Sequence, residues 1–169
     1  ILVVSARTLM HRVAPVDFVQ GQALSLDVEQ RFDLQAERAR LTRAGYRHVE
    51  TVMERGEFAV RGSIVDVFPM GAELPLRIDL FDDEIESLRS FDPESQRTVA
   101  RLPGVQILPA REFPMDEAAI ARFRDSWHRS FVADVRRCEV YQDVSQGSVP
   151  QGVEYYLPLF FEATSTLFD

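Results

Sequence analysis

Three residues have the types and spacing of a protein-binding surface, namely Arg61, Arg77 and Phe81. Side chains alternate between the two faces of a β-strand, so Arg77 and Phe81 share the face opposite the leucines in the run Leu74–Phe81. The same alternation in the run Glu57–Arg61 turns Arg61 away from the apolar side. If the two strands are neighbours, we expect all three side chains on one exposed surface. An exposed aromatic ring flanked by guanidinium groups has the composition of a binding hot spot.

Each of these residues also has a simpler interpretation. The arginines could pair locally with nearby acids such as Asp79 and Asp83, in exposed ion pairs worth about 0–1 kcal/mol. Phe81 could be buried, as phenylalanine often is. It can join the core, however, only if a β-bulge shifts the register of its strand. The alternation therefore favours an exposed ring.

An acidic run in the same region could be read as a divalent-metal site. Its carboxylates belong to Asp66, Asp79, Asp82, Asp83, Glu84 and Glu86. Metal sites need oxygens that converge at about 2.0–2.6 Å, and nothing in this spacing forces the carboxylates to converge. The pair Asp82-Asp83 also suits an ordinary turn between strands. We therefore expect no metal site here.

The other reactive side chains form no catalytic pattern. The three histidines are scattered, the serines lie in no nucleophile-elbow motif, and no Gly-x-Gly-x-x-Gly opens a helix. All 19 basic residues are arginine, which excludes a phosphate-loop or Schiff-base lysine within this segment. We expect no catalytic residue and no bound cofactor, and hence a segment that is not itself an enzyme.

The composition limits the classes of partner. With 169 residues, 46% of them apolar, the chain can form one domain, or one domain and part of another. A net charge of −8 opposes strong unaided binding to nucleic acid or to an anionic membrane. The single cysteine, Cys138, allows no internal disulfide, and no apolar run reaches membrane-spanning length. We expect a cytoplasmic protein with no membrane partner.

The pattern of elements predicts an α/β fold of the α+β kind, with a mixed and largely antiparallel sheet and a flanking helix. The apolar run Ile1–Val4 is typical of a buried strand, and Ala6–Val13 is expected to be helical. Asp33 suits the N-cap of a helix that ends before Gly45, and a strand is expected over Tyr46–Val52.

The last third of the chain is predicted to be mainly helical. A final short strand is expected over Gly104–Leu108, followed by a domain boundary. Asp116 then suits the N-cap of a long amphipathic helix. The apolar stripe of that helix comprises Ile120, Phe123, Trp127 and Phe131. The densely apolar segment Val153–Phe161 must also pack against something.

Several segments resemble the excinuclease-B-homology module, which occurs in the repair protein UvrB and in bacterial transcription-repair coupling factors. The matching motifs are Gly45-Tyr46-Arg47, Gly56–Gly62, Asp66-Val67-Phe68-Pro69, Leu76-Arg77-Ile78, Phe81–Ser87 and Phe91-Asp92. Two further segments, Gln96-Arg97-Thr98 and Gly152–Phe161, resemble the coupling factors specifically. The aromatic β-hairpin of UvrB is not evident.

The resemblance implies a division of the chain into three parts. Residues 1–20 would end the first half of a degenerate helicase-like α/β domain that is split in sequence. Residues 21–109 would form the inserted UvrB-homology module, and residues 110–169 would start the second, mainly helical half.

The resemblance also implies a function in transcription-coupled nucleotide excision repair. The module would bind UvrA and so recruit it to a stalled RNA polymerase, and Arg61, Arg77 and Phe81 match the family's UvrA-contacting positions. From the sequence we expect Arg77→Ala to weaken UvrA binding by about 2 kcal/mol or more and to leave the fold intact.

The longer parent protein would, by the same resemblance, be an ATP-dependent DNA translocase of helicase superfamily 2. Its motor domains, which lie outside this segment, would use ATP and Mg²⁺, and it would contact RNA polymerase and upstream duplex DNA. A second interpretation is a UvrB-like segment that touches DNA directly, which the acidic net charge disfavours.

Overall fold

The computed structural model describes residues 3, 5–166 and 168, and it has the predicted mixture of helices with a mostly antiparallel sheet. The strand expected over residues 1–4 falls outside the described residues except for Val3, which is exposed. The chain divides into two compact units, residues 21–111 and residues 1–20 with 112–169.

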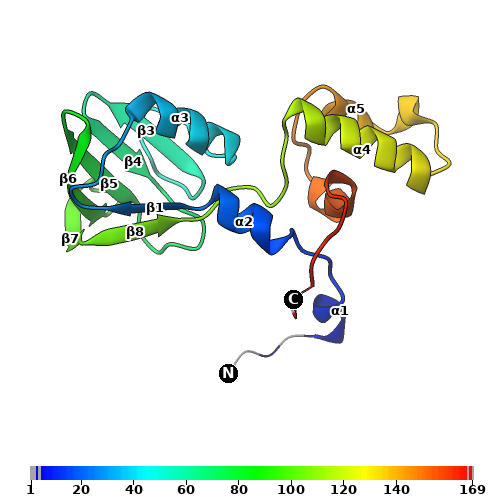
Figure 1. Ribbon diagram of the computed structural model, residues 1–169, viewed down its shortest axis with the longest axis horizontal. Coiled ribbons are helices and arrows are strands. Elements are labelled where there is room, and N and C mark those ends of the chain that lie inside the picture. Colours follow the sequence, from blue (N-terminus) through cyan, green and yellow to red (C-terminus); the bar gives the residue numbers. More distant parts are fainter. Residues whose placement is uncertain (1–2, 4, 167, 169) are drawn as a thin grey trace. The chain divides into compact units, whose positions relative to one another are not determined.

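The unit of residues 21–111 is built on a six-stranded sheet (Figure 1). In spatial order its strands are β2 (Arg47–His48), β3 (Glu57–Arg61), β4 (Ile64–Val67), β5 (Leu76–Phe81), β6 (Glu84–Phe91) and β7 (Thr98–Leu102). The short β2 runs parallel to β3, and every other neighbouring pair is antiparallel. The strands β2 and β7 therefore form the two edges.

One face of this sheet carries the main hydrophobic core. It is covered by α3 (Leu34–Arg43) and by an antiparallel ribbon of β1 (Leu24–Asp27) and β8 (Gly104–Ile107) (Figure 1). The alternate residues of β5 that face this core, Leu76, Ile78 and Leu80, are all buried. We call this side of the sheet the core face.

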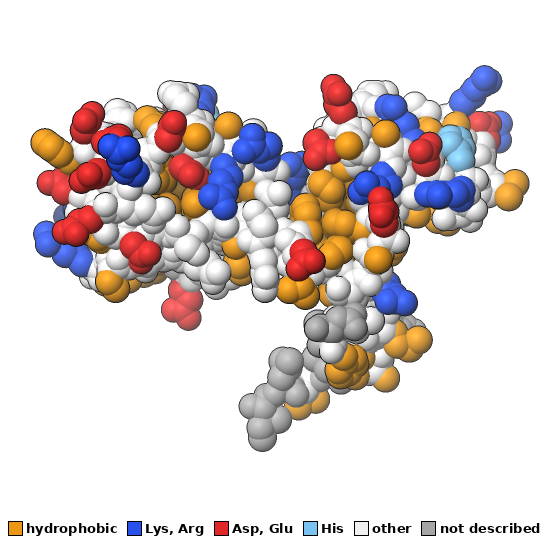
Figure 2. Space-filling view, viewed as in Figure 1, with side chains coloured by type: hydrophobic (Ala, Val, Ile, Leu, Met, Phe, Trp, Pro, Cys, Tyr) orange, Lys and Arg blue, Asp and Glu red, His pale blue; other side chains and the backbone are white. Residues whose placement is uncertain are grey.

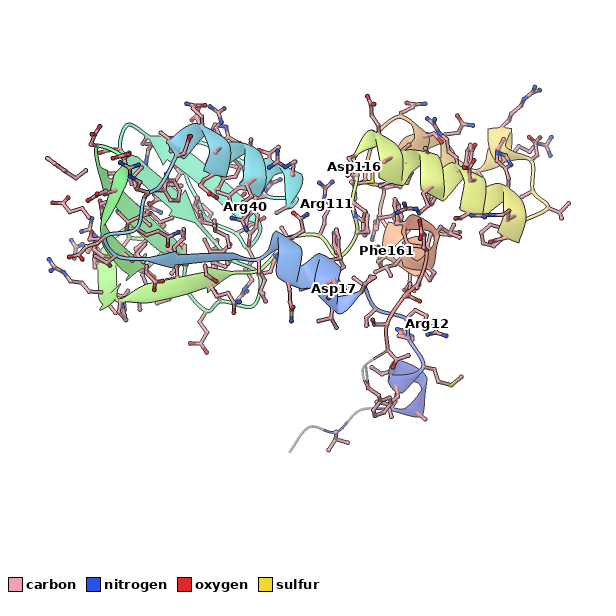
Figure 3. All side chains as sticks on the ribbon, in the orientation of Figure 1. Arg12, Asp17, Arg40, Arg111, Asp116 and Phe161 are labelled. Carbon is pink, nitrogen blue, oxygen red and sulfur yellow. The ribbon has the colours of Figure 1, made fainter. Side chains whose placement is uncertain are left out.

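The helix α3 has the two ends that its sequence predicts. The carboxylate of Asp33 accepts hydrogen bonds from the backbone N–H groups of Gln35 and Ala36, both at 3.0 Å. At the other end Gly45 has a positive φ of +95°, which only glycine adopts without strain. Arg111, labelled in Figure 3, donates from its guanidinium to the carbonyl oxygen of Arg43 at 3.3 Å.

The opposite face of the sheet carries a smaller apolar cluster, comprising Val52, Ala59, Phe68 and Phe91. Val52 comes from the segment after β2, where a strand over Tyr46–Val52 was expected. That prediction was wrong in extent, because only Arg47–His48 pair with β3. The rest of the segment turns over the sheet, and its apolar residues serve this second cluster.

The other unit is helical. Its elements are α1 (Ala6–Leu9), α4 (Glu117–Ser130), α5 (Glu139–Ser145), the 3₁₀ helices η1 (Val135–Arg137) and η2 (Val153–Phe160), and most of α2 (Val16–Gln22), whose last two residues belong to the unit of residues 21–111. The predicted helix over Ala6–Val13 is shorter than expected, since Val13 instead pairs with Ser165 in an antiparallel bridge. In the described residues no helix has both the length and the apolar character needed to cross a membrane.

The helix α4 confirms its predicted cap and most of its predicted stripe. The carboxylate of Asp116 accepts from the backbone N–H of Ala119 at 2.8 Å. Phe123 and Trp127 are buried against η2, whereas Phe131 lies just beyond the helix and is partly exposed. The apolar segment after Gly152 packs as η2, with Val153, Leu157 and Phe160 buried.

Candidate functional site

The face of the sheet opposite α3 gathers polar side chains from five strands, and we call it the arginine face. Its members include Glu57, Arg61, Asp66, Arg77, Asp79, Phe81, Glu84, Ser87, Arg89 and Arg101. Strand alternation brings them together, because residues directly opposite one another in an antiparallel pair point to the same side. The three residues singled out in the sequence, Arg61, Arg77 and Phe81, thus share one side of the sheet.

Asp66 is the buried centre of this face, with 1% of its side chain exposed. Arg77 lies directly opposite on β5 and binds it in a bidentate way, with Nε–Oδ1 at 2.7 Å and Nη2–Oδ2 at 2.8 Å. Arg61 donates from Nη2 to the same Oδ2 atom. One carboxylate thus holds both guanidinium groups side by side. Its hydrogen bonds with Arg77 also raise the pKa of that guanidinium above its ordinary value.

Arg77 is mostly buried, with only 14% of its side chain exposed. Its guanidinium carbon lies 4.5 Å from the ring centre of Phe91, in a cation–π contact. It also donates to the backbone carbonyl and to the side-chain oxygen of Gln96, at 3.4 and 3.2 Å. Arg77 therefore contributes to the stability of the fold, and Arg77→Ala is expected to lower that stability.

Phe81 projects into solvent, with 75% of the residue exposed. A β-bulge is present next to it, since the register between β5 and β6 shifts between Asp79 and Leu80. The extra residue belongs to β6, because Asp79 faces Ser87 and Leu80 faces Ile85. Strand β5 itself keeps its alternation, so Leu80 is buried and the Phe81 ring stays outside.

The acids that the sequence offered as local partners bind other residues. Asp79 accepts from Nε of Arg89 at 3.0 Å and from the hydroxyl of Ser87 at 2.7 Å. Asp83 pairs with Arg31 at 3.5 Å, and both side chains are largely exposed. The alternative interpretation, in which the arginines pair with acids of this region, therefore holds for Arg61 and Arg77, with Asp66 as the acid. Within the described part of the chain, no three His, Cys, Asp or Glu residues are grouped so as to hold a metal ion.

A second buried carboxylate, that of Glu57, fastens the segment of residues 49–56 to the sheet. It accepts from the backbone N–H groups of Met53 and Glu54, both at 2.9 Å, and from Nη2 of Arg47 at 2.6 Å. Burial alone would raise the pKa of Glu57, but these hydrogen bonds outweigh burial and lower it below its ordinary value. This segment supplies Val52, which covers the apolar cluster beneath Arg77.

Sequence reasoning missed the two residues that position Arg77, namely Asp66 as its ion-pair partner and Gln96 as its acceptor. A signal for Asp66 was present, because it is a lone carboxylate inside the apolar run Ile64–Val67. Gln96 gave no such signal, since it lies in a turn 19 residues after Arg77 in the chain, with a positive φ of +59°.

The largely antiparallel sheet, covered on one side by a helix and a ribbon and polar on the other, defines the class of this unit as an α+β domain. Residues 24–113 match the UvrB interaction domain family, and the chain belongs to this family. That family is an interaction domain and not a catalytic one. The three residues of the candidate site lie inside the matched segment.

The proteins to which the chain is similar are transcription-repair-coupling factors. It is 51% identical over 161 residues to that of Escherichia coli (strain K12), a match that covers 95% of this chain and 14% of that protein. It is 44% identical over 164 residues to that of Haemophilus influenzae, covering 96% of this chain and 14% of that protein. It is 38% identical over 176 residues to that of Myxococcus xanthus, covering 99% of this chain and 14% of that protein. The chain thus spans about a seventh of these relatives.

Proposed function

We propose that this chain is the UvrA-binding part of a transcription-repair coupling factor and acts in transcription-coupled nucleotide excision repair. In this role it recruits UvrA to a stalled RNA polymerase. The observation that carries the proposal is the arrangement of Arg61, Arg77 and Phe81, in which an exposed ring stands on the same face as two guanidinium groups fixed on one carboxylate. The match to the UvrB interaction domain and the similarity to coupling factors support it.

The three residues contribute differently to such an interface. Phe81 offers the apolar anchor, because its ring is free to fill a pocket on the partner. Arg61, with 45% of its side chain exposed, retains N–H groups that can donate to a carboxylate of UvrA. Arg77 is held by Asp66 before any partner arrives, which lowers the entropy that binding must remove.

The activity of the longer protein is part of the same proposal. The coupling factor to which this chain would belong is an ATP-dependent DNA translocase that contacts RNA polymerase and duplex DNA in the cytoplasm. ATP and Mg²⁺ act in its motor domains, outside residues 1–169. This chain contributes recruitment and no chemistry.

A binding titration of the chain with purified UvrA tests the proposal. Phe81→Ala should weaken binding about thirtyfold, equivalent to about 2 kcal/mol, because the ring is a hot-spot anchor. Its matched control is Phe131→Ala, which removes a partly exposed phenylalanine from the other compact unit and should bind like wild type. Wild-type affinity in Phe81→Ala, or no binding by the wild-type chain, would refute the proposal.

A further inference from the structure

Three arginines of the arginine face lie directly opposite one another across three strands. Arg77 of β5 faces Arg89 of β6, and Arg89 faces Arg101 of β7. Neighbouring strands are about 4.8 Å apart, so these guanidinium groups leave the sheet as one row. We call Arg77, Arg89 and Arg101 the arginine row.

Such a row costs stability, because like charges directly opposite each other in a sheet repel. Two of its members are neutralised within the chain, Arg77 by Asp66 and Arg89 by Asp79. Arg101 is exposed, and no side chain among the described residues pairs with it. The chain has 27 acidic residues, so the lack of a partner here does not reflect a shortage of carboxylates. Among the described residues, Arg101 is thus the member of the arginine row whose N–H groups are not taken up by a side chain of this chain.

We propose that the arginine row extends the docking surface from Phe81 to the edge strand β7, where Arg101 takes a carboxylate of UvrA. This inference rests on the proposed function. Guanidinium groups bind carboxylates in a bidentate way, and β7 ends the sheet, so no further strand blocks access to Arg101.

The charges around the row favour an acidic protein segment over nucleic acid. The carboxylates of Asp82, Asp83, Glu84 and Glu86 flank the turn and strand beside Phe81, and all four residues are exposed. The chain as a whole has a net charge of −8. A phosphate backbone that tracked along this face would meet these acids, whereas a folded protein can present separate carboxylates to the row.

The test compares two charge reversals, Arg101→Glu and Arg38→Glu, in the full chain. Arg38 is also exposed and has no side-chain partner among the described residues, but it lies on α3, which covers the core face. Arg101→Glu should slow association with UvrA roughly tenfold and reduce its dependence on salt, as loss of a steering charge does. Arg38→Glu should associate like wild type.

Thermal unfolding separates a docking role from a structural one. In Arg101→Glu the new carboxylate would face Arg89, so the midpoint should equal or exceed that of wild type. Slower association with a lower midpoint would mean damage to the fold and would count against the docking role.

The remaining outcomes separate this inference from the function on which it rests. If Phe81→Ala weakens binding while Arg101→Glu associates like Arg38→Glu, the row plays no part in docking and only the further inference fails. If the wild-type chain does not bind UvrA, both fail. If wild type shifts a short duplex DNA at low salt and Arg101→Glu does not, the assignment of an acidic protein segment is overturned.

Discussion

At the scale of single residues, Asp66 sets the geometry of the candidate site. Its two oxygens accept from both Arg61 and Arg77, and it is almost completely buried. A buried charge is tolerable only when it is paired, and here the pairing also fixes the two cations at the surface. The same carboxylate therefore serves the stability of the sheet and the preorganisation of the site.

Neutralising Asp66 should thus be costly. Asp66→Asn leaves two adjacent guanidinium groups without their counter-charge, and we expect the free energy of unfolding to fall by about 3 kcal/mol. Arg77→Ala should cost about 1–3 kcal/mol, because Asp66 keeps only Arg61 as a charged partner. Denaturant titration followed by circular dichroism measures both.

Phe81→Ala serves as the control for these two variants. Because the ring is largely exposed, its removal should change the free energy of unfolding by no more than about 0.5 kcal/mol. An Asp66→Asn variant that unfolds at the same denaturant concentration as wild type would contradict a stabilising role for this carboxylate.

At the scale of elements, local patterns predicted what depends on neighbours in the sequence. The structure confirms four such predictions, because each depends on residues a few positions away. They are the N-caps Asp33 and Asp116, the glycine after α3, and the residues of β5 that point to the core face. The placement of Phe81 was also predictable, since the bulge beside it falls on the partner strand.

Features set by distant residues escaped prediction. The acid that binds Arg77 depends on the register between β4 and β5, which no local pattern gives. Strand β7 was not predicted, because it is an exposed edge strand without an alternating apolar face. The strand over Tyr46–Val52 was predicted too long, since Val52 packs in the second cluster and not in a ladder. The short helix α5 was not predicted either.

The end of α3 offers a prediction at this scale. A Cβ atom at Gly45 would lie 2.7 Å from Cγ and Nε of Arg111, in addition to the strain of a positive φ. We expect Gly45→Ala to lower the free energy of unfolding by about 3 kcal/mol. Chemical denaturation measures the effect.

Gly71→Ala separates the two causes. Gly71 also has a positive φ, of +78°, but a Cβ there would meet nothing within 4 Å. This variant should therefore show only the backbone cost, about 1 kcal/mol. Equal losses in the two variants would mean that contact with Arg111 contributes nothing to the helix end.

At the scale of the whole molecule, the positions of the charged side chains say more about the partner than the net charge does. The chain has a net charge of −8, and charged side chains of both signs are spread over each of the two units (Figure 2). On the arginine face Arg77, Arg89 and Arg101 stand directly opposite one another, while Asp66 and Asp79 are taken up by Arg77 and Arg89, and Glu84 lies opposite Phe81. A row of arginines on an acidic protein favours a partner with exposed carboxylates and limits attraction to nucleic acid.

Hydroxyl-radical footprinting of the chain with and without UvrA tests the central claim most directly, because it reports the solvent access of individual aromatic side chains. Phe81 is 75% exposed in the unit of residues 21–111, and Tyr155 is 81% exposed in the other unit, so each should be oxidised readily in the free chain. The proposed docking predicts that UvrA protects Phe81 severalfold and leaves Tyr155 unchanged. Continued oxidation of Phe81 in the UvrA complex would contradict it, above all if Tyr155 became protected instead.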